Sequence, residues 1–157
     1  MTEIYTDGAS RGNPGPGGWG VIITSDSKVL ELGGSDPQTT NNKMELTAAI
    51  RALEAAQDKK LTIYTDSEYV AKGMTEWIGN WQKKGWKTAN KKPVLNQDLW
   101  QKLLALSAGR EIIWKYVPAH SGVRLNERAD EIATSFADSV SGSEMPKLFH
   151  GPKDSYR

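Results

Sequence analysis

The chain has 157 residues, no cysteine and a formal net charge of +1. This length predicts one domain, the lack of cysteine excludes disulfides and thiolate metal sites, and the small net charge gives no global argument for a nucleic-acid partner. No stretch approaches the roughly 18 apolar residues of a membrane span and the N-terminus lacks a secretory pattern, so we expect a cytoplasmic protein without a membrane partner.

Apolar periodicity and turn residues predict a mixed sheet with helices packed on it. Residues 2–7, 19–24 and 28–33 read as strands of an antiparallel meander, with a glycine- and proline-rich loop at 8–18. The later elements expected are a helix at 43–58, a strand at 61–66, short helical stretches at 67–73 and 75–84, a basic loop at 85–94, a helix at 96–106, a strand at 111–117 and a helix at 124–138. We therefore expect an α/β fold with a mixed five-stranded sheet, an antiparallel meander plus parallel strands, flanked by helices.

The last part of the chain differs in composition from the rest. Residues 139–157 are rich in Ser, Gly, Pro and Lys and show no periodicity. We expect them to form a flexible tail, poorly ordered or loosely docked, behind a single domain that spans residues 1–138.

The tetrapeptide Ile-Tyr-Thr-Asp occurs twice, at 4–7 and at 63–66. If the two strands lie side by side and parallel, Asp7 and Asp66 meet at a separation of about 4.8 Å. Two carboxylates that close repel each other unless a proton or cation lies between them, which indicates a divalent-metal site. The alternative is local: Asp7-Gly8 is a common turn dipeptide, and Asp66-Ser67 could cap the next helix.

Glu45 is the third candidate carboxylate. It lies in line with Ala49, Ala52 and Ala56 on the helix predicted at 43–58, and such a stripe of small residues lets a helix approach a sheet closely. We expect Glu45 to point at the sheet, although it could also form a capping box with Asn42. A site made only of oxygen ligands favours Mg²⁺, or Mn²⁺, over zinc.

Two further polar residues follow the last predicted strand. His120 is succeeded by Ser121-Gly122, which predicts a mobile loop, and Asp130 lies at the edge of the apolar stripe of the final helix. Each has an ordinary alternative, because His120 could be a surface residue and Asp130 an acid near a helix N-terminus.

A basic segment stands out against the balanced net charge. Residues 77–97 contain no acidic side chain, and tryptophans are interleaved with their lysines, which are Lys83, Lys84, Lys87, Lys91 and Lys92. Basic side chains with aromatics are typical of a surface that contacts a phosphate backbone. The alternative is a solvated loop whose tryptophans, Trp81 and Trp86, belong to the core.

The stretch at 15–20, G-P-G-G-W-G, matches the dinucleotide-binding pattern G-x-G-x-x-G. That pattern must open a helix. Here the strand-like Val21-Ile22-Ile23-Thr24 follows instead, so we reject it and expect these glycines to form a tight turn near the site.

Five segments in order make the chain resemble the ribonuclease H type 1 family over nearly all of residues 2–138. They are TDGASRGNPGPGGWG at 6–20, TTNNKMEL at 39–46, TDSEYV at 65–70, WIGNWQKKGWKT at 77–88 and HSGVRLNERADEIA at 120–133. Glu68, Gly79 and Ser10 depart from residues that many or some relatives carry, and none of them is one of the four carboxylates.

The resemblance implies residue roles. It implies that the metal-binding carboxylates are Asp7, Glu45, Asp66 and Asp130, and that His120 assists proton transfer or product release. It also implies that the Trp-rich handle at 77–94 grips the DNA strand of a hybrid. The candidate nucleic-acid contacts are Asn13, Thr40, Asn41, Asn42, Trp77, Trp81, Lys83, Lys84, Trp86 and Lys87.

The expected function is hydrolysis of the RNA strand of RNA–DNA hybrids by a monomer. The resemblance implies two Mg²⁺ ions, with Mn²⁺ possible, and products with 5′-phosphate and 3′-hydroxyl ends. Two alternatives remain, a nuclease of the same superfold that acts on DNA junctions and a non-catalytic hybrid-binding module. The second predicts a missing carboxylate, and all four are present.

Overall fold

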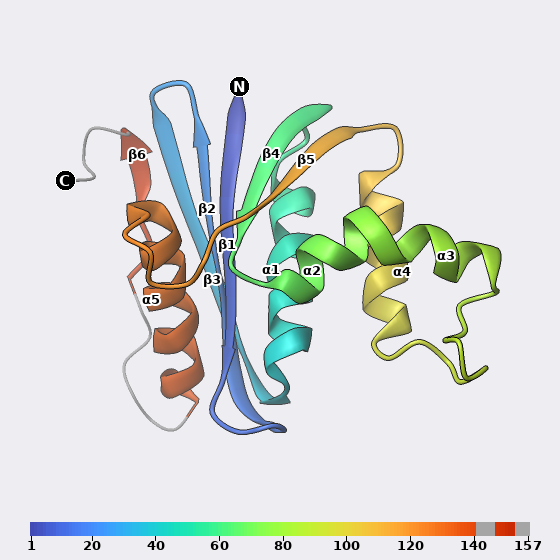
Figure 1. Cartoon of the computed structure of the whole chain (residues 1–157). Helices are drawn as coiled ribbons and strands as arrows, with labels where there is room; N and C mark the ends of the chain where they lie inside the picture. The colour runs from blue at the N-terminus through green and yellow to red at the C-terminus, as the bar shows by residue number, and fades with distance from the viewer. Residues whose placement is uncertain (141–146, 153–157) are drawn as a thin grey trace.

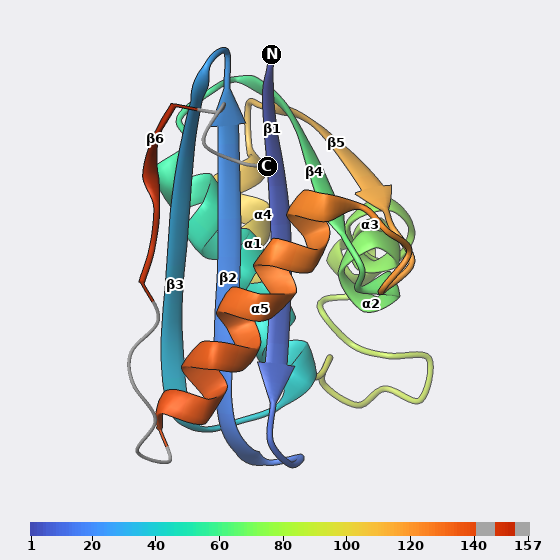
Figure 2. The ribbon, with the colours of Figure 1, turned by 90° about the vertical axis from the view of Figure 1, so that its left-hand side faces the viewer.

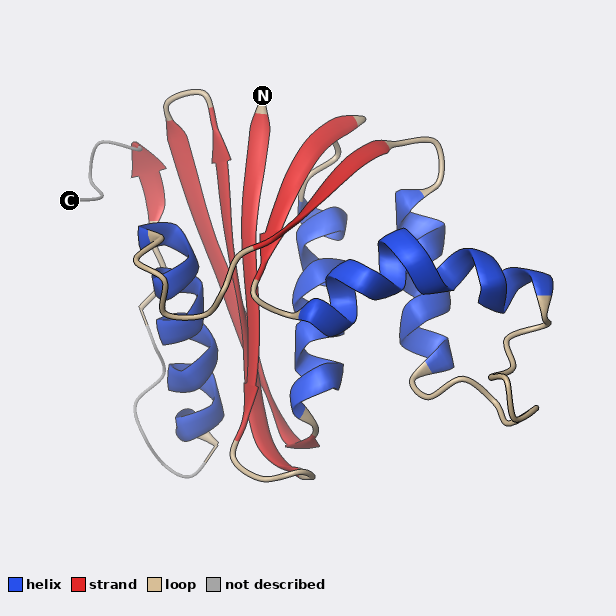
Figure 3. Cartoon of the chain, viewed as in Figure 1, coloured by secondary structure: helices blue, strands red, loops and turns tan. Residues whose placement is uncertain are grey.

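The sheet lies between helices that cover its two faces, as Figures 1 and 3 show. The computed structural model describes residues 1–140 and 147–152. Its strands are β1 (Thr2–Ser10), β2 (Gly15–Ser25), β3 (Lys28–Thr39), β4 (Lys60–Thr65), β5 (Glu111–Tyr116) and β6 (His150–Pro152). Its helices are α1 (Asn41–Ala55), α2 (Glu68–Lys72), the π-helical turn η1 (Gly73–Trp77), α3 (Ile78–Lys83), α4 (Gln97–Ser107) and α5 (Arg124–Ser139).

The strand order β5-β4-β1-β2-β3-β6 confirms the mixed sheet, with one strand more than the five expected. Strands β1, β2 and β3 form the antiparallel meander, whereas β4 runs parallel to both β1 and β5. The repeated tetrapeptides pair in register, with Tyr5 opposite Tyr64 and Thr6 opposite Thr65. The two tyrosine rings stack with their centroids 4.7 Å apart.

Helix α1 supplies the main apolar layer on one face of the sheet. Its buried side chains, among them Leu46, Ile50 and Leu53, pack on strand residues such as Ile4 and Ile63. The predicted cap Asn42 is wrong. The helix begins earlier, and the side chain of Thr40 accepts a hydrogen bond from the Lys43 amide at 3.2 Å. The local sequence Thr-Thr-Asn-Asn offers several good caps, and propensity alone does not choose among them.

The glycine-rich segment does not form the expected tight turn. Its residues lie in β2, because the meander extends well beyond the predicted 19–24. A Cβ on Gly18 would collide with the Ala133 carbonyl, and a Cβ on Gly20 would collide with the Ala129 carbonyl. Glycine therefore lets α5 lie directly on the sheet, in the oblique crossing that Figure 2 shows.

Residues 147–152 of the expected tail are docked on the sheet, which is one of the two arrangements that its composition suggested. Strand β6 pairs with the edge of β3 (Figure 2), and the Glu31 amide donates to the Phe149 carbonyl at 2.7 Å. The Glu31 carboxylate accepts two bonds from the Arg128 guanidinium, at 2.7 and 2.9 Å, and one from the Phe149 amide at 2.9 Å. The other parts of the tail, residues 141–146 and 153–157, lie outside the described residues.

Across residues 1–140 and 147–152, no helix combines the length and the apolar character needed to cross a lipid bilayer.

The Glu31–Arg128 pair predicts a large effect on stability, because the Glu31 side chain is only 1% exposed. Replacing Arg128 by alanine leaves this buried carboxylate without its two guanidinium bonds, and we expect unfolding to become easier by about 2–4 kcal/mol. Urea unfolding measures the change. Arg124→Ala, at an exposed position on the same helix, is the control and should change stability by about 0.5 kcal/mol or less. Equal effects of the two substitutions would refute the role of the pair.

Candidate active site

The site lies where β4 ends and β1 continues, paired from there on only with β2. The last residues paired between β1 and β4 are Thr6 and Thr65. Asp7 and Asp66 follow them side by side, as the repeat predicted. Asp7 is 2% exposed, and its Oδ1 accepts a hydrogen bond from the Gly8 amide at 2.9 Å. Directly after Asp66, the Ser67 side chain caps α2 by accepting from the Val70 amide at 3.1 Å. Ser67, not Asp66, is therefore the helix cap.

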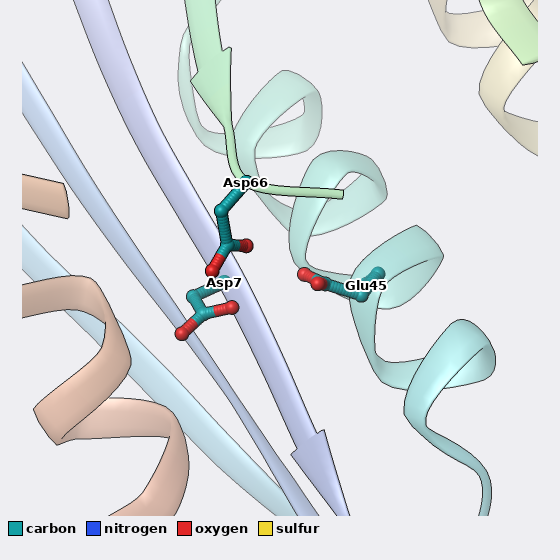
Figure 4. Close-up of side chains that lie close together, drawn as sticks. All are labelled: Asp7, Glu45 and Asp66. Atoms are coloured by element: carbon teal, nitrogen blue, oxygen red, sulfur yellow. The ribbon is translucent and has the colours of Figure 1, made fainter. Parts of the chain in front are cut away.

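Glu45 reaches the same space from the first turns of α1. A Cβ on Gly8 would collide with the Glu45 amide, so a glycine at this position lets the helix approach β1 closely. Glu45 is 5% exposed, and Figure 4 shows its carboxylate directed at Asp7 and Asp66. The alternative capping box with Asn42 is absent, because Thr40 is the cap residue.

The three carboxylates form one cluster. One oxygen of each of Asp7, Glu45 and Asp66 lies within 4.8 Å of the others. Burial raises the pKa of Asp7 far above its usual range, and the negative charges of Glu45 and Asp66 raise it further. Burial and the charge of Asp66 likewise raise the pKa of Glu45. Without a cation, the folded protein thus disfavours ionisation of acids that would be charged in water.

The donor set fits a hard divalent cation. Among the described residues, the buried atoms Glu45 Oε1 and Asp66 Oδ1 have no hydrogen-bond partner. Buried oxygens of this kind normally find a donor, and a bound cation would satisfy them instead. The ligands are all oxygens, which Mg²⁺ and Mn²⁺ prefer.

Asp130 adds a fourth carboxylate from the other face of the sheet. It lies on α5, and its side chain is within hydrogen-bonding reach of Asp7, where it helps to raise the pKa of that group. The close contact of α5 with Gly18 and Gly20 brings the helix near enough for this approach. Asp130 is therefore a neighbour of the cluster, next to Asp7.

His120 lies apart from the compact cluster. It is exposed on the loop that joins β5 to α5, with a φ of 55°. It is not among the described residues whose ligand atoms converge within 4.8 Å of one another. A catalytic role for His120 stays a prediction.

The polar residues predicted to contact nucleic acid, Asn13, Thr40, Asn41 and Asn42, line one hollow of about 370 Å³. Asn13 faces it from the loop after β1, and the first residues of α1 face it from the other side. Its full lining is Asn13, Thr40, Asn41, Asn42, Lys43, Leu95 and Asn96. Sequence reasoning missed Leu95 and Asn96. The sequence offered two weak signals, an apolar residue next to the basic loop and an asparagine at a helix start. In the structure Leu95 is 74% exposed and Asn96 has a φ of 59°.

The tryptophans of the basic segment are largely structural. Trp77, Trp81 and Trp86 are half-buried, and their rings contact one another with centroids 5.9 and 6.1 Å apart. Trp81 also packs on the fully buried Trp100 of α4 at 5.2 Å. This packing joins α3 to α4, and Figure 1 shows α3 lying away from the sheet.

The lysines of the same segment present their charge to solvent. Lys83, Lys84 and Lys87 are all exposed. Trp77, Trp81, Lys84 and Lys87 line a further hollow of about 190 Å³. Binding of nucleic acid by this segment stays a prediction.

Comparisons with known proteins agree with one another. A model of the RNase H family matches residues 1–138. The ribonuclease H of Thermosynechococcus vestitus is 59% identical over 138 residues, covering 85% of this chain and 86% of that protein. The ribonuclease H of Halorhodospira halophila is 52% identical over 141 residues, covering 89% and 95%.

Two solved structures share the fold. LC9-RNase H1, described as a type 1 RNase H with the type 2 active-site motif, gives a TM-score of 0.82 at 30% identity, covering 99% of this chain and 79% of that one. LC11-RNase H1, solved in complex with an RNA/DNA hybrid, gives 0.71 at 30% identity, covering 90% and 100%.

The repulsion within the cluster predicts that the metal-free protein is weakened by its own acids. The folded-state pKa of Asp7 is raised, so protonated Asp7 contributes fully to stability below about pH 4. This contribution is lost progressively as the pH rises from there through the folded-state pKa. In EDTA, Asp7→Asn should therefore melt about 3–8 °C higher than the wild type at pH 7, with no advantage near pH 4.

Thermal unfolding at several pH values, with and without Mg²⁺, measures both effects. Mg²⁺ should raise the melting temperature of the wild type and have little effect on Asp7→Asn. Asp26→Asn is the control, since Asp26 is exposed in the β2–β3 turn with a φ of 52°, which asparagine also adopts. A wild type and Asp7→Asn with parallel pH profiles would show that the cluster is not repulsive.

Proposed function

The chain belongs to the ribonuclease H family, type 1, whose members are metal-dependent endoribonucleases that cleave the RNA strand of RNA–DNA hybrids, and we propose that this protein does so by a two-metal-ion mechanism that leaves 5′-phosphate and 3′-hydroxyl ends. The observation that carries the proposal is the convergence of Asp7, Glu45 and Asp66 with buried oxygens that lack a donor. We propose residues 1–138 as the catalytic domain, with residues 77–94 as its handle.

The carboxylates would hold the cations and keep them at a fixed place relative to the sheet. Asp7, Glu45, Asp66 and Asp130 are the proposed ligands of Mg²⁺, with Mn²⁺ as a substitute. When bound, the ions would supply Lewis acidity to activate the attacking water and to stabilise the charge that develops on the leaving 3′ oxygen. Four elements of regular structure, β1, α1, the end of β4 and α5, carry these ligands, so little reorganisation would be needed on binding.

The remaining residues would bind and orient the hybrid. Asn13, Thr40, Asn41 and Asn42 offer amide and hydroxyl groups around one hollow, which suits contacts to backbone and 2′-hydroxyl groups. His120, on an exposed loop, would move a proton between the site and solvent. Lys83, Lys84 and Lys87 would attract the DNA strand through its phosphates.

Loss of one carboxylate should abolish turnover and spare binding. With a labelled RNA–DNA hybrid and Mg²⁺, Asp66→Asn should lower the cleavage rate by about 100-fold or more, because it removes a metal ligand without removing a backbone contact. Gel analysis of cleavage and a filter-binding Kd for the same hybrid measure the two effects.

The wild type with EDTA and Asp26→Asn with Mg²⁺ serve as controls, and only the second should cleave. End-labelling of the products tests for 5′-phosphate. Cleavage by the wild type in EDTA, or full turnover by Asp66→Asn, would refute the proposed role of the cluster.

The basic segment gives a separate prediction about salt. Replacing Lys83, Lys84 and Lys87 by alanine should raise KM by about 3- to 30-fold at low salt and reduce the salt dependence of KM. The matched control replaces Lys28, Lys59 and Lys60, which are also exposed and lie at the starts of β3 and β4, outside the handle. If both triple variants change KM alike, net charge and not the handle governs binding.

A further inference from the structure

The loop between β1 and β2 carries one residue toward α5 and another toward α1. In Figure 1 this loop lies at the lower end of the sheet, between the layers formed by these helices. Arg11 contacts Asp138 at the end of α5, whereas Asn13 lines the hollow that the first residues of α1 form. One short loop thus joins the helix that supplies Asp130 to a proposed contact with the hybrid.

The contact between Arg11 and Asp138 is bidentate. Arg11 Nε lies 2.7 Å from one carboxylate oxygen of Asp138, and a terminal guanidinium nitrogen lies 3.0 Å from the other. Such fork-shaped pairing fixes orientation as well as distance, which a lysine cannot reproduce. The backbone is held too, since the Arg11 amide donates to the Pro16 carbonyl at 2.7 Å and the Ser10 hydroxyl donates to the Gly12 carbonyl at 2.7 Å.

The pair is poorly placed to stabilise the fold as a whole. The two side chains are 49% and 47% exposed, and ion pairs this open contribute little to the free energy of unfolding. Their spatial arrangement is specific nevertheless, because they join segments 127 residues apart in the chain. Asp138 is the principal partner of the guanidinium, and the negative charge of Asp130 also favours its charged form.

We infer that Arg11 is a positioning residue, which uses Asp138 as an anchor to hold the loop at 11–14 so that Asn13 faces the hollow. This inference rests on the proposed function, because it takes the hollow as the place where the hybrid backbone binds. Arg11 acts through Asn13 and need not touch the substrate. Its loss therefore weakens binding of the hybrid and leaves the metal-binding carboxylates in place.

Steady-state kinetics with a labelled hybrid and Mg²⁺ test the inference. Arg11→Ala and Asp138→Ala should each raise KM by about 3- to 10-fold, with kcat within about twofold of the wild type. The charge-swapped double variant Arg11→Asp/Asp138→Arg should recover much of the lost affinity. Arg11→Lys should have a lower affinity than this double variant, because lysine keeps the positive charge but cannot form the bidentate contact.

The control is Arg51→Ala, which removes an exposed arginine with its own half-buried acidic partner, Glu54, at 3.6 Å on α1. Its KM should match that of the wild type. If Arg11→Ala raises KM while Asp138→Ala leaves KM unchanged or lowers it, Arg11 binds the hybrid directly and the inference is wrong. Unchanged KM values in both variants also overturn it.

Amide hydrogen exchange separates this inference from the proposed function. In Arg11→Ala without any hybrid, exchange at residues 11–13 should become faster by several-fold, while exchange in α5 stays as in the wild type. A wild type that fails to cleave the hybrid refutes the proposed function alone. Unchanged exchange in the loop refutes the anchoring role, whatever the activity.

Discussion

Mutual repulsion among closely spaced carboxylates is the constraint on which the structure of the site depends. Asp7, Glu45 and Asp66 have oxygens within 4.8 Å of one another, and burial raises the pKa of the first two. A protein interior tolerates such a group only where the surrounding structure holds it in place. Here the parallel register of β1 and β4 places two of the acids, and the contact of α1 with Gly8 places the third. The strength of the fold elsewhere therefore maintains a site that is unfavourable without a cation.

Glycine determines how closely the two helical layers approach this site. Gly8 admits α1 on one face of the sheet, and Gly18 and Gly20 admit α5 on the other. Any larger side chain at these positions would move a helix outward and carry Glu45 or Asp130 away from Asp7. The same closeness keeps Asp7 and Glu45 buried, and burial strengthens the electrostatic interactions in the cluster. The absence of side chains at three positions thus sets the geometry of four carboxylates.

The sequence predicted the parts of the fold that depend on local pattern. The in-phase repeat predicted the pairing of Asp7 with Asp66, and the alanine stripe predicted that Glu45 faces the sheet, whereas Asp130 came from the family resemblance. The glycine segment was misread as a turn because glycine is depleted in strands. Glycine is needed in this strand because Ala129 and Ala133, far along the chain, lie against it. Strand β6 escaped prediction for the same reason, since its docking depends on Glu31 and Arg128 and not on its own propensity.

The docking of β6 has a consequence for the order in which the molecule is built during translation. Every other described element precedes β6 in the chain, so the ribosome delivers it last. Until then β3 is a free sheet edge, with its backbone groups open to strands of neighbouring nascent chains. The four carboxylates lie on or next to β1, α1, β4 and α5, all of which precede β6 in the chain. Arrival of the last strand therefore covers the first part of the β3 edge, at Lys28, Val29 and Leu30, after the elements that carry the four carboxylates have been made.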